Sequence, residues 1–131
     1  MSTRIQQSEV IPAEPAVVYE LLTSSERFSE MTGGAPANID AAAGGAISLF
    51  GGMITGQTIE AVDGKRLVQA WRPQPWADGT YSIVRFDIAP EGVDSSRVTL
   101  EHVGFPDDEL DHLTQGWIDN YWNPMRALVG P

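Results

Sequence analysis

The sequence contains no cysteine, which excludes disulfide bonds, thiolate nucleophiles and cysteine-ligated zinc. It has a single lysine, Lys65, and no apolar run approaching the roughly 18 residues that a membrane-spanning helix needs. The first residues lead into alternating sequence without the apolar core of a secretory leader. These absences favour a reducing compartment, and we expect the chain in the cytoplasm.

Basic residues are scarce as well. The chain has eight basic and 18 acidic residues, which gives a formal net charge of −10. A molecule of this charge repels phosphate backbones and anionic lipids, so neither nucleic acid nor a membrane is an expected partner. The acidity is typical of a soluble protein, and a docking surface for a basic protein is the alternative interpretation. With 131 residues, 42% of them hydrophobic, and no repeat or linker, we expect one globular domain over residues 1–131.

The first third of the chain reads as a strand followed by two short helices. Residues 4–11 alternate as in a strand that Pro12 ends, and Pro15 suits the first position of a helix. The run Thr23-Ser24-Ser25-Glu26 resembles a capping box that opens a second helix. Gly33-Gly34 would end that helix.

A period of two then continues to Val103 and predicts strands at residues 36–39, 46–50, 53–62, 65–72, 80–88 and 97–103. Gly51-Gly52 and Asp63-Gly64 are interpreted as hairpin turns between them. In the last two strands apolar and charged residues alternate, which predicts an antiparallel sheet with one covered and one wet face.

The remaining residues are typical of an amphipathic helix. Acidic residues 107–109 favour its start, and Pro124 predicts a kink near Asn120. An apolar stripe follows helical spacing: Leu113, Trp117, Tyr121, Met125 and Leu128. The covered sheet face is the surface available to bury this stripe. The fold class is therefore predicted as α+β, a curved antiparallel sheet wrapped around a long C-terminal helix, with two short helices after the first strand.

Several runs carry a family resemblance that covers nearly the whole chain in order. They are Pro12-Ala13-Glu14-Pro15-Ala16-Val17-Val18-Tyr19, Phe50-Gly51-Gly52 with Gly56, Trp71-Arg72-Pro73-Gln74-Pro75-Trp76-Ala77-Asp78-Gly79-Thr80-Tyr81-Ser82, Val103-Gly104-Phe105-Pro106, and Gly116-Trp117-Ile118-Asp119-Asn120-Tyr121-Trp122. The chain resembles the C-terminal domain of the activator of heat-shock protein 90 ATPase, within the START-like (SRPBCC, helix-grip) superfamily. The resemblance implies a helix-grip fold, a hydrophobic ligand beneath the long helix, and a chaperone partner in the stress response.

A pocket between sheet and helix is the predicted binding site. Its candidate ligand-binding residues are Gln69, Trp71, Phe86, Leu100, His102, Trp117, Tyr121 and Met125. Aromatic walls with a few polar groups are typical of a small-ligand site. The alternative is that these large side chains simply fill the core.

His102 is the most informative polar residue among them. On a covered face, an imidazole is expected to be a hydrogen-bonded core residue, and a ligand contact or a general base acting with Tyr121 or Gln69 are the alternatives. Asp108, Asp111 and His112 make too exposed a set for a metal, and no phosphate loop or nucleophile elbow occurs. No catalytic residue, metal or cofactor is predicted.

Three functions are thus carried forward. The leading prediction is a non-enzymatic binding protein for a small hydrophobic ligand. The alternatives are a protein-interaction (co-chaperone-like) module and a small cyclase- or dehydratase-type enzyme using His102 and Tyr121. Sequence does not fix the oligomeric state.

Overall fold

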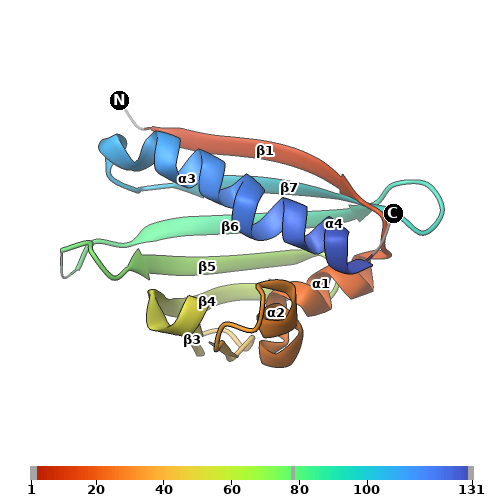
Figure 1. Ribbon diagram of the computed structural model, residues 1–131, viewed down its shortest axis with the longest axis horizontal. Coiled ribbons are helices and arrows are strands. Elements are labelled where there is room, and N and C mark those ends of the chain that lie inside the picture. Colours follow the sequence, from red (N-terminus) through yellow and green to blue (C-terminus); the bar gives the residue numbers. More distant parts are fainter. Residues whose placement is uncertain (1–2, 78, 130–131) are drawn as a thin grey trace.

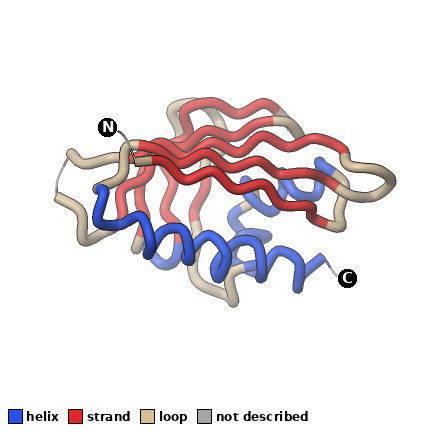
Figure 2. Tube along the Cα trace, turned by 90° about the horizontal axis from the view of Figure 1, so that it is seen from above, coloured by secondary structure: helices blue, strands red, loops and turns tan. Residues whose placement is uncertain are grey.

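The computed structural model describes residues 3–77 and 79–129. A seven-stranded antiparallel sheet, in the order β1-β7-β6-β5-β4-β3-β2, covers one side of a long C-terminal helical segment (Figure 1). Seen from above, the sheet arches over that segment (Figure 2). The α+β helix-grip prediction is confirmed. No helix among the described residues is both long and apolar enough to cross a membrane.

The strands follow the predicted alternation closely. Their bounds are β1 Arg4–Ile11, β2 Asn38–Ile39, β3 Ala46–Leu49, β4 Ile54–Val62, β5 Arg66–Pro73, β6 Ser82–Pro90 and β7 Ser96–Val103. On the inner face, Val84 pairs with His102 and Phe86 pairs with Leu100, and all four side chains are buried. The face toward the helices is therefore the covered face that the alternating pattern predicted.

Helices α1 (Pro15–Thr23) and α2 (Ser25–Met31) lie between β1 and β2 in the chain, as predicted. The predicted capping box is wrong by one residue. Ser24 is the N-cap of α2, and its hydroxyl accepts a hydrogen bond from the Arg27 amide at 3.3 Å. The hydroxyl of Thr23 instead donates to the Tyr19 carbonyl at 2.8 Å, which keeps Thr23 in the last turn of α1.

The predicted hairpin at Gly51-Gly52 is confirmed, since β3 and β4 pair on either side of it, but its connection covers residues 50–53. Residues Phe50–Gly52 form a short 3-10 turn, η1, in which Phe50 has a φ of 53° and the two glycines have φ values of 68° and 93°. The Gly51 amide donates to the Pro36 carbonyl at 2.8 Å, which holds this turn against the chain that enters β2. A positive φ is unusual for an aromatic residue and costs of order 1–3 kcal/mol, so packing must hold it in place.

The C-terminal segment consists of four consecutive helical pieces. They are η2 Asp107–Glu109, α3 Leu110–Trp117, a π-helical turn η3 Ile118–Trp122, and α4 Asn123–Val129. The irregularity expected from Pro124 lies at the predicted place and takes the form of the π-helical turn, which contains Asn120. A wider turn accommodates the proline ring, which cannot donate to the carbonyl four residues earlier. The segment crosses the sheet from the β1 side toward α2 (Figure 1).

Strands β4 and β5 approach each other closely at Gly56, which pairs with Trp71. A Cβ atom on Gly56 would lie 1.8 Å from the Ala70 carbonyl oxygen, a contact that real side chains do not make. Glycine is therefore required for the pairing that places Trp71 on the inner face.

Gly56→Ala is expected to lower the free energy of unfolding by about 3 kcal/mol, at the upper end of overpacking costs, because the colliding atom is backbone and cannot rotate away. Gly116→Ala is the control. Its Cβ would meet only the Asn120 Nδ2 atom, at 3.7 Å, within a helix, so its stability should rise by up to about 1 kcal/mol. Urea unfolding measures both variants, and equal midpoints would contradict the close approach at Gly56.

Candidate functional site

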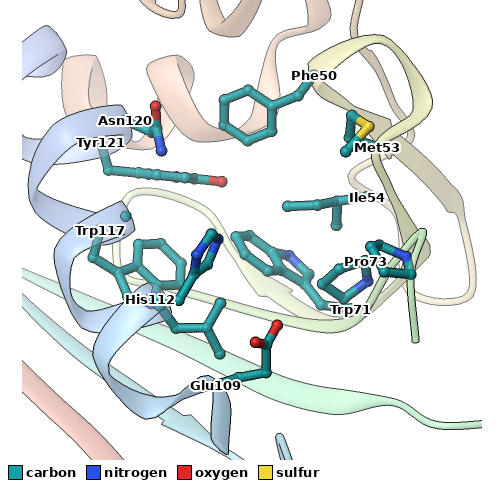
Figure 3. A pocket seen from close by; sticks show the side chains of 13 residues that line it. Phe50, Met53, Ile54, Trp71, Pro73, Glu109, His112, Trp117, Asn120 and Tyr121 are labelled. Carbon is teal, nitrogen blue, oxygen red and sulfur yellow. The ribbon is translucent and has the colours of Figure 1, made fainter. Parts of the chain in front are cut away.

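A groove of about 490 Å³ lies between the C-terminal segment and the β4–β5 side of the sheet (Figure 3). Its sheet side comes from the η1 turn, the start of β4, and the end of β5 with the loop that follows. The side chains are all apolar: Phe50, Met53, Ile54, Trp71, Pro73 and Pro75. The two prolines have no backbone N–H and none of these side chains is charged, so this wall offers mostly van der Waals contact.

The helix side of the groove mixes apolar and polar groups at helical spacing. The apolar members are Leu113, Gly116, Trp117 and Tyr121, and the polar members are Glu109, His112 and Asn120. Gly116 carries no side chain, so the groove extends to the helix backbone at that point. The polar residues lie toward the rim, where His112 and Asn120 are exposed.

Stacked and tilted rings form the floor of the groove. The ring centroids of Trp71 and Trp117 are 4.9 Å apart with planes at 21°, and those of Trp117 and Tyr121 are 4.5 Å apart. Phe50 packs edge-on against Phe28 at 5.5 Å and against Tyr121 at 6.2 Å. These contacts hold Phe50 in its unusual backbone conformation and fix the wall it provides.

The Tyr121 hydroxyl is the unusual polar group of this site. The residue is only 3% exposed, its side chain projects into the groove toward Ile54, and it makes no hydrogen bond with any described residue (Figure 3). Burial raises the pKa of this phenol well above its usual value, so it keeps its proton and can act as a donor. The oxygen opens onto the groove and is not fully enclosed, so water or a ligand placed there can bond it.

The loop after β5 covers one end of the groove and is fixed by hydrogen bonds. The Trp76 indole donates from Nε1 to Glu109 Oε1 at 3.2 Å. Arg72 donates to the Trp76 carbonyl at 3.1 Å and to the Ala77 carbonyl at 3.3 Å. The orientation of Glu109 at the groove is thus set by the same loop that carries Pro75.

Three of the eight residues expected in the pocket line this groove: Trp71, Trp117 and Tyr121. The other five are buried in the core and do not line it: Gln69, Phe86, Leu100, His102 and Met125. Gln69 acts on the groove indirectly, because its Oε1 accepts from the Trp71 indole at 2.8 Å and orients that ring.

Sequence reasoning missed the outer wall of the groove, which Phe50, Met53, Ile54, Pro73 and Pro75 provide. One signal was available in the sequence, because Met53 is a large apolar residue directly after the Gly51-Gly52 turn; the structure leaves it 50% exposed. Periodicity alone assigns such residues to strand ends and does not show that two strand ends meet beneath a helix.

His102 is fully buried within a chain of hydrogen bonds. The Trp117 indole donates to its Nδ1 at 3.2 Å, which leaves the proton on Nε2 and lets that atom donate to the Ser82 hydroxyl at 2.8 Å. The Ser82 hydroxyl in turn donates to the Trp71 carbonyl at 3.4 Å. Burial lowers the pKa of His102 from 6.5 to about 3, so the imidazole is neutral.

This neutral imidazole predicts acid sensitivity with a defined sign. Between pH 6.5 and about 3 the unfolded chain binds a proton that the folded chain does not, so stability must fall as the pH falls through that window. We expect a loss of about 1.5 kcal/mol between pH 6.5 and about 5, measured by urea unfolding, from this residue alone.

His102→Asn is expected to flatten that dependence. The control is His112→Asn, which removes the only other histidine, an exposed one, and should retain it. An unchanged slope in His102→Asn would mean that the buried imidazole does not titrate on unfolding in this range.

Known proteins resemble this chain in both sequence and fold. The family model described as "Activator of Hsp90 ATPase homolog 1-like protein" matches residues 12–130. The structure is similar to that of an HSP90 activator from Plasmodium falciparum, with a TM-score of 0.92 at 22% identity over 97% of this chain and 96% of that one. It also resembles the Aha1 dimer from Colwellia psychrerythraea, with a TM-score of 0.80 at 15% identity over 96% of each chain.

Among curated relatives, the human activator of 90 kDa heat shock protein ATPase homolog 1 is 24% identical over 127 residues. The aligned part is 97% of this chain but 37% of the human protein, so the chain spans little more than a third of that relative. A homologue from Dictyostelium discoideum is 31% identical over 83 residues, which are 63% of this chain and 22% of that protein. The family model alone covers far more than half of the sequence, and the chain belongs to the Activator of Hsp90 ATPase homolog 1-like protein family.

Proposed function

We propose that this chain is a non-enzymatic binding domain whose groove holds a small hydrophobic ligand. The observation that carries the proposal is the Tyr121 hydroxyl, which opens onto a groove with an apolar sheet wall and makes no hydrogen bond with any described residue. A volume of about 490 Å³ falls within the range of about 300–1,000 Å³ that is usual for ligand sites. We expect a ligand that hydrogen-bonds to the Tyr121 hydroxyl and covers the indole rings of Trp71 and Trp117.

The arrangement of titratable groups supports binding over catalysis. Both nitrogens of His102 are occupied by Trp117 and Ser82, so it has no free nitrogen to accept a substrate proton. Tyr121 can donate a hydrogen bond, but its raised pKa keeps the phenol protonated, so it does not act as a base at neutral pH. A cyclase or dehydratase would need a base held against the substrate. Of the other groove residues that could accept a proton, His112 is exposed at the rim, and Glu109 is half-buried at one end and already bonded to Trp76.

The test is to fill the groove without disturbing the core. Gly116→Leu places a side chain where a Cβ meets only Asn120, so the variant should fold with the helix side of the groove obstructed. We expect wild-type protein to bind the neutral, polarity-sensitive dye Nile red with enhanced fluorescence, and the leucine variant to lose at least about tenfold in affinity, as expected for a steric block of over 1.4 kcal/mol.

Gly116→Ala is the matched control and should bind the dye nearly as well as wild type, because a methyl group leaves the groove open. Native mass spectrometry of gently purified protein should in addition show a retained small molecule that the leucine variant lacks. Equal dye binding by wild type and Gly116→Leu would contradict a ligand site in this groove.

A second candidate function follows from the family. Relatives named as activators of the heat-shock protein 90 ATPase suggest that this chain too contacts that chaperone. A binding domain can serve both roles if the chaperone contacts the outer sheet face or the Trp76 loop and leaves the groove free.

The chaperone role has a direct measurement. Added to heat-shock protein 90, the chain is expected to increase the rate of ATP hydrolysis, and Gly116→Leu should do so equally well if the groove is separate from the interface. No change in the chaperone's ATPase rate with an excess of folded chain would exclude the activator role for this domain.

A further inference from the structure

One acidic residue, Glu109, lines the groove, and no lysine or arginine does. The polar remainder consists of the Tyr121 phenol, the Asn120 carboxamide and the His112 imidazole, which is exposed at the rim. A carboxylate or phosphate ligand would therefore find no lysine or arginine at this site to replace its water.

Glu109 lies at one end of the groove, and Tyr121 lies farther along it, beyond Trp71 and Trp117 (Figure 3). One carboxylate oxygen of Glu109 accepts a hydrogen bond from the Trp76 indole. The basic residue Arg72, on β5, donates to the carbonyls of Trp76 and Ala77. Glu109 makes no ion pair with any described residue. Its negative charge is thus fixed in place and not neutralised locally.

The field of the whole molecule has the same sign. A net charge of −10 on 131 residues raises the local concentration of cations and lowers that of anions at any cleft. Indole faces at the groove, from Trp71 and Trp117, also attract cations through the ring quadrupole. The Glu109 carboxylate, the indole rings and the net negative charge of the molecule all favour a positively charged ligand.

We propose that the ligand is a hydrophobic amine: a ring-bearing apolar body against Trp71 and Trp117, with a protonated nitrogen at Glu109. This inference rests on the proposed function, since it names the chemical class that the same groove selects. It excludes fatty acids and other carboxylates of similar size as the preferred ligands.

The test uses three probes with one carbon skeleton and three head groups: naphthylmethylamine, naphthylmethanol and naphthoic acid, all of the same ring isomer. Displacement of Nile red gives the dissociation constant of each. The amine should bind about tenfold more tightly than the acid, with the alcohol between them, and the ratio should shrink as salt is added.

Glu109→Gln is the decisive variant. The glutamine keeps an oxygen that can accept from Trp76 and removes only the charge, so the ratio between amine and acid should fall to about threefold or less, the part left to the overall field. Asp111→Asn is the matched control. It removes one charge from the same helix start at an exposed position outside the groove and should keep the wild-type ratio.

The outcomes separate this inference from the proposed function. If Nile red fails to bind, or binds Gly116→Leu equally well, the groove is not a ligand site and both proposals fail. If the dye binds in the groove but the three probes compete equally, or none competes, the binding function stands and selection of a hydrophobic amine is overturned. The same holds if Glu109→Gln and Asp111→Asn change the ratio alike.

Discussion

The structure depends on how Trp117 is seated between the helix and the sheet. Its ring stacks on Trp71 of β5, while its indole nitrogen donates to His102 of β7. One side chain therefore fixes the helix to two strands that are separated by β6 in the sheet. Because His102 is neutral and bonded on both nitrogens, this buried contact carries no uncompensated charge. Trp117 thereby positions the helix over the core and also forms part of the groove wall.

The same helical segment is also tied to the first strand through Gln7. The Trp122 indole donates to the Gln7 side-chain oxygen at 2.6 Å, and the Gln7 amide donates to the Thr114 carbonyl at 3.2 Å. The π-helical turn places Trp117 and Trp122, five residues apart, on one side of the segment, where their rings stack with centroids 6.2 Å apart. Pro124 is the cause of that turn that the sequence makes visible.

The groove lies where the sheet is least completely covered by the helix. Toward β1 the helix packs on the strands directly, whereas toward β4 the wall consists of the η1 turn and the proline-rich loop. The same region contains the positive φ of Phe50 and the close approach at Gly56. Of the two non-glycine residues with positive φ in the described part of the chain, Phe50 and Asp94, the first lines the candidate site, which is consistent with a wall shaped for binding as well as for stability. Family membership assigns no ligand to the groove.

The sequence by itself determined the elements and the covered faces. Alternation in β6 and β7 and the stripe through Trp117, Tyr121 and Met125 were enough for the helix-grip architecture, because burial of one face is a local property of spacing. It also located the helix irregularity through Pro124. The tertiary structure alone decided which aromatic residues face empty space and which face each other. Phe86 and Trp117 look equivalent in sequence, yet Phe86 is enclosed in the core and Trp117 reaches the groove, since cavity shape depends on contacts between residues far apart in the chain.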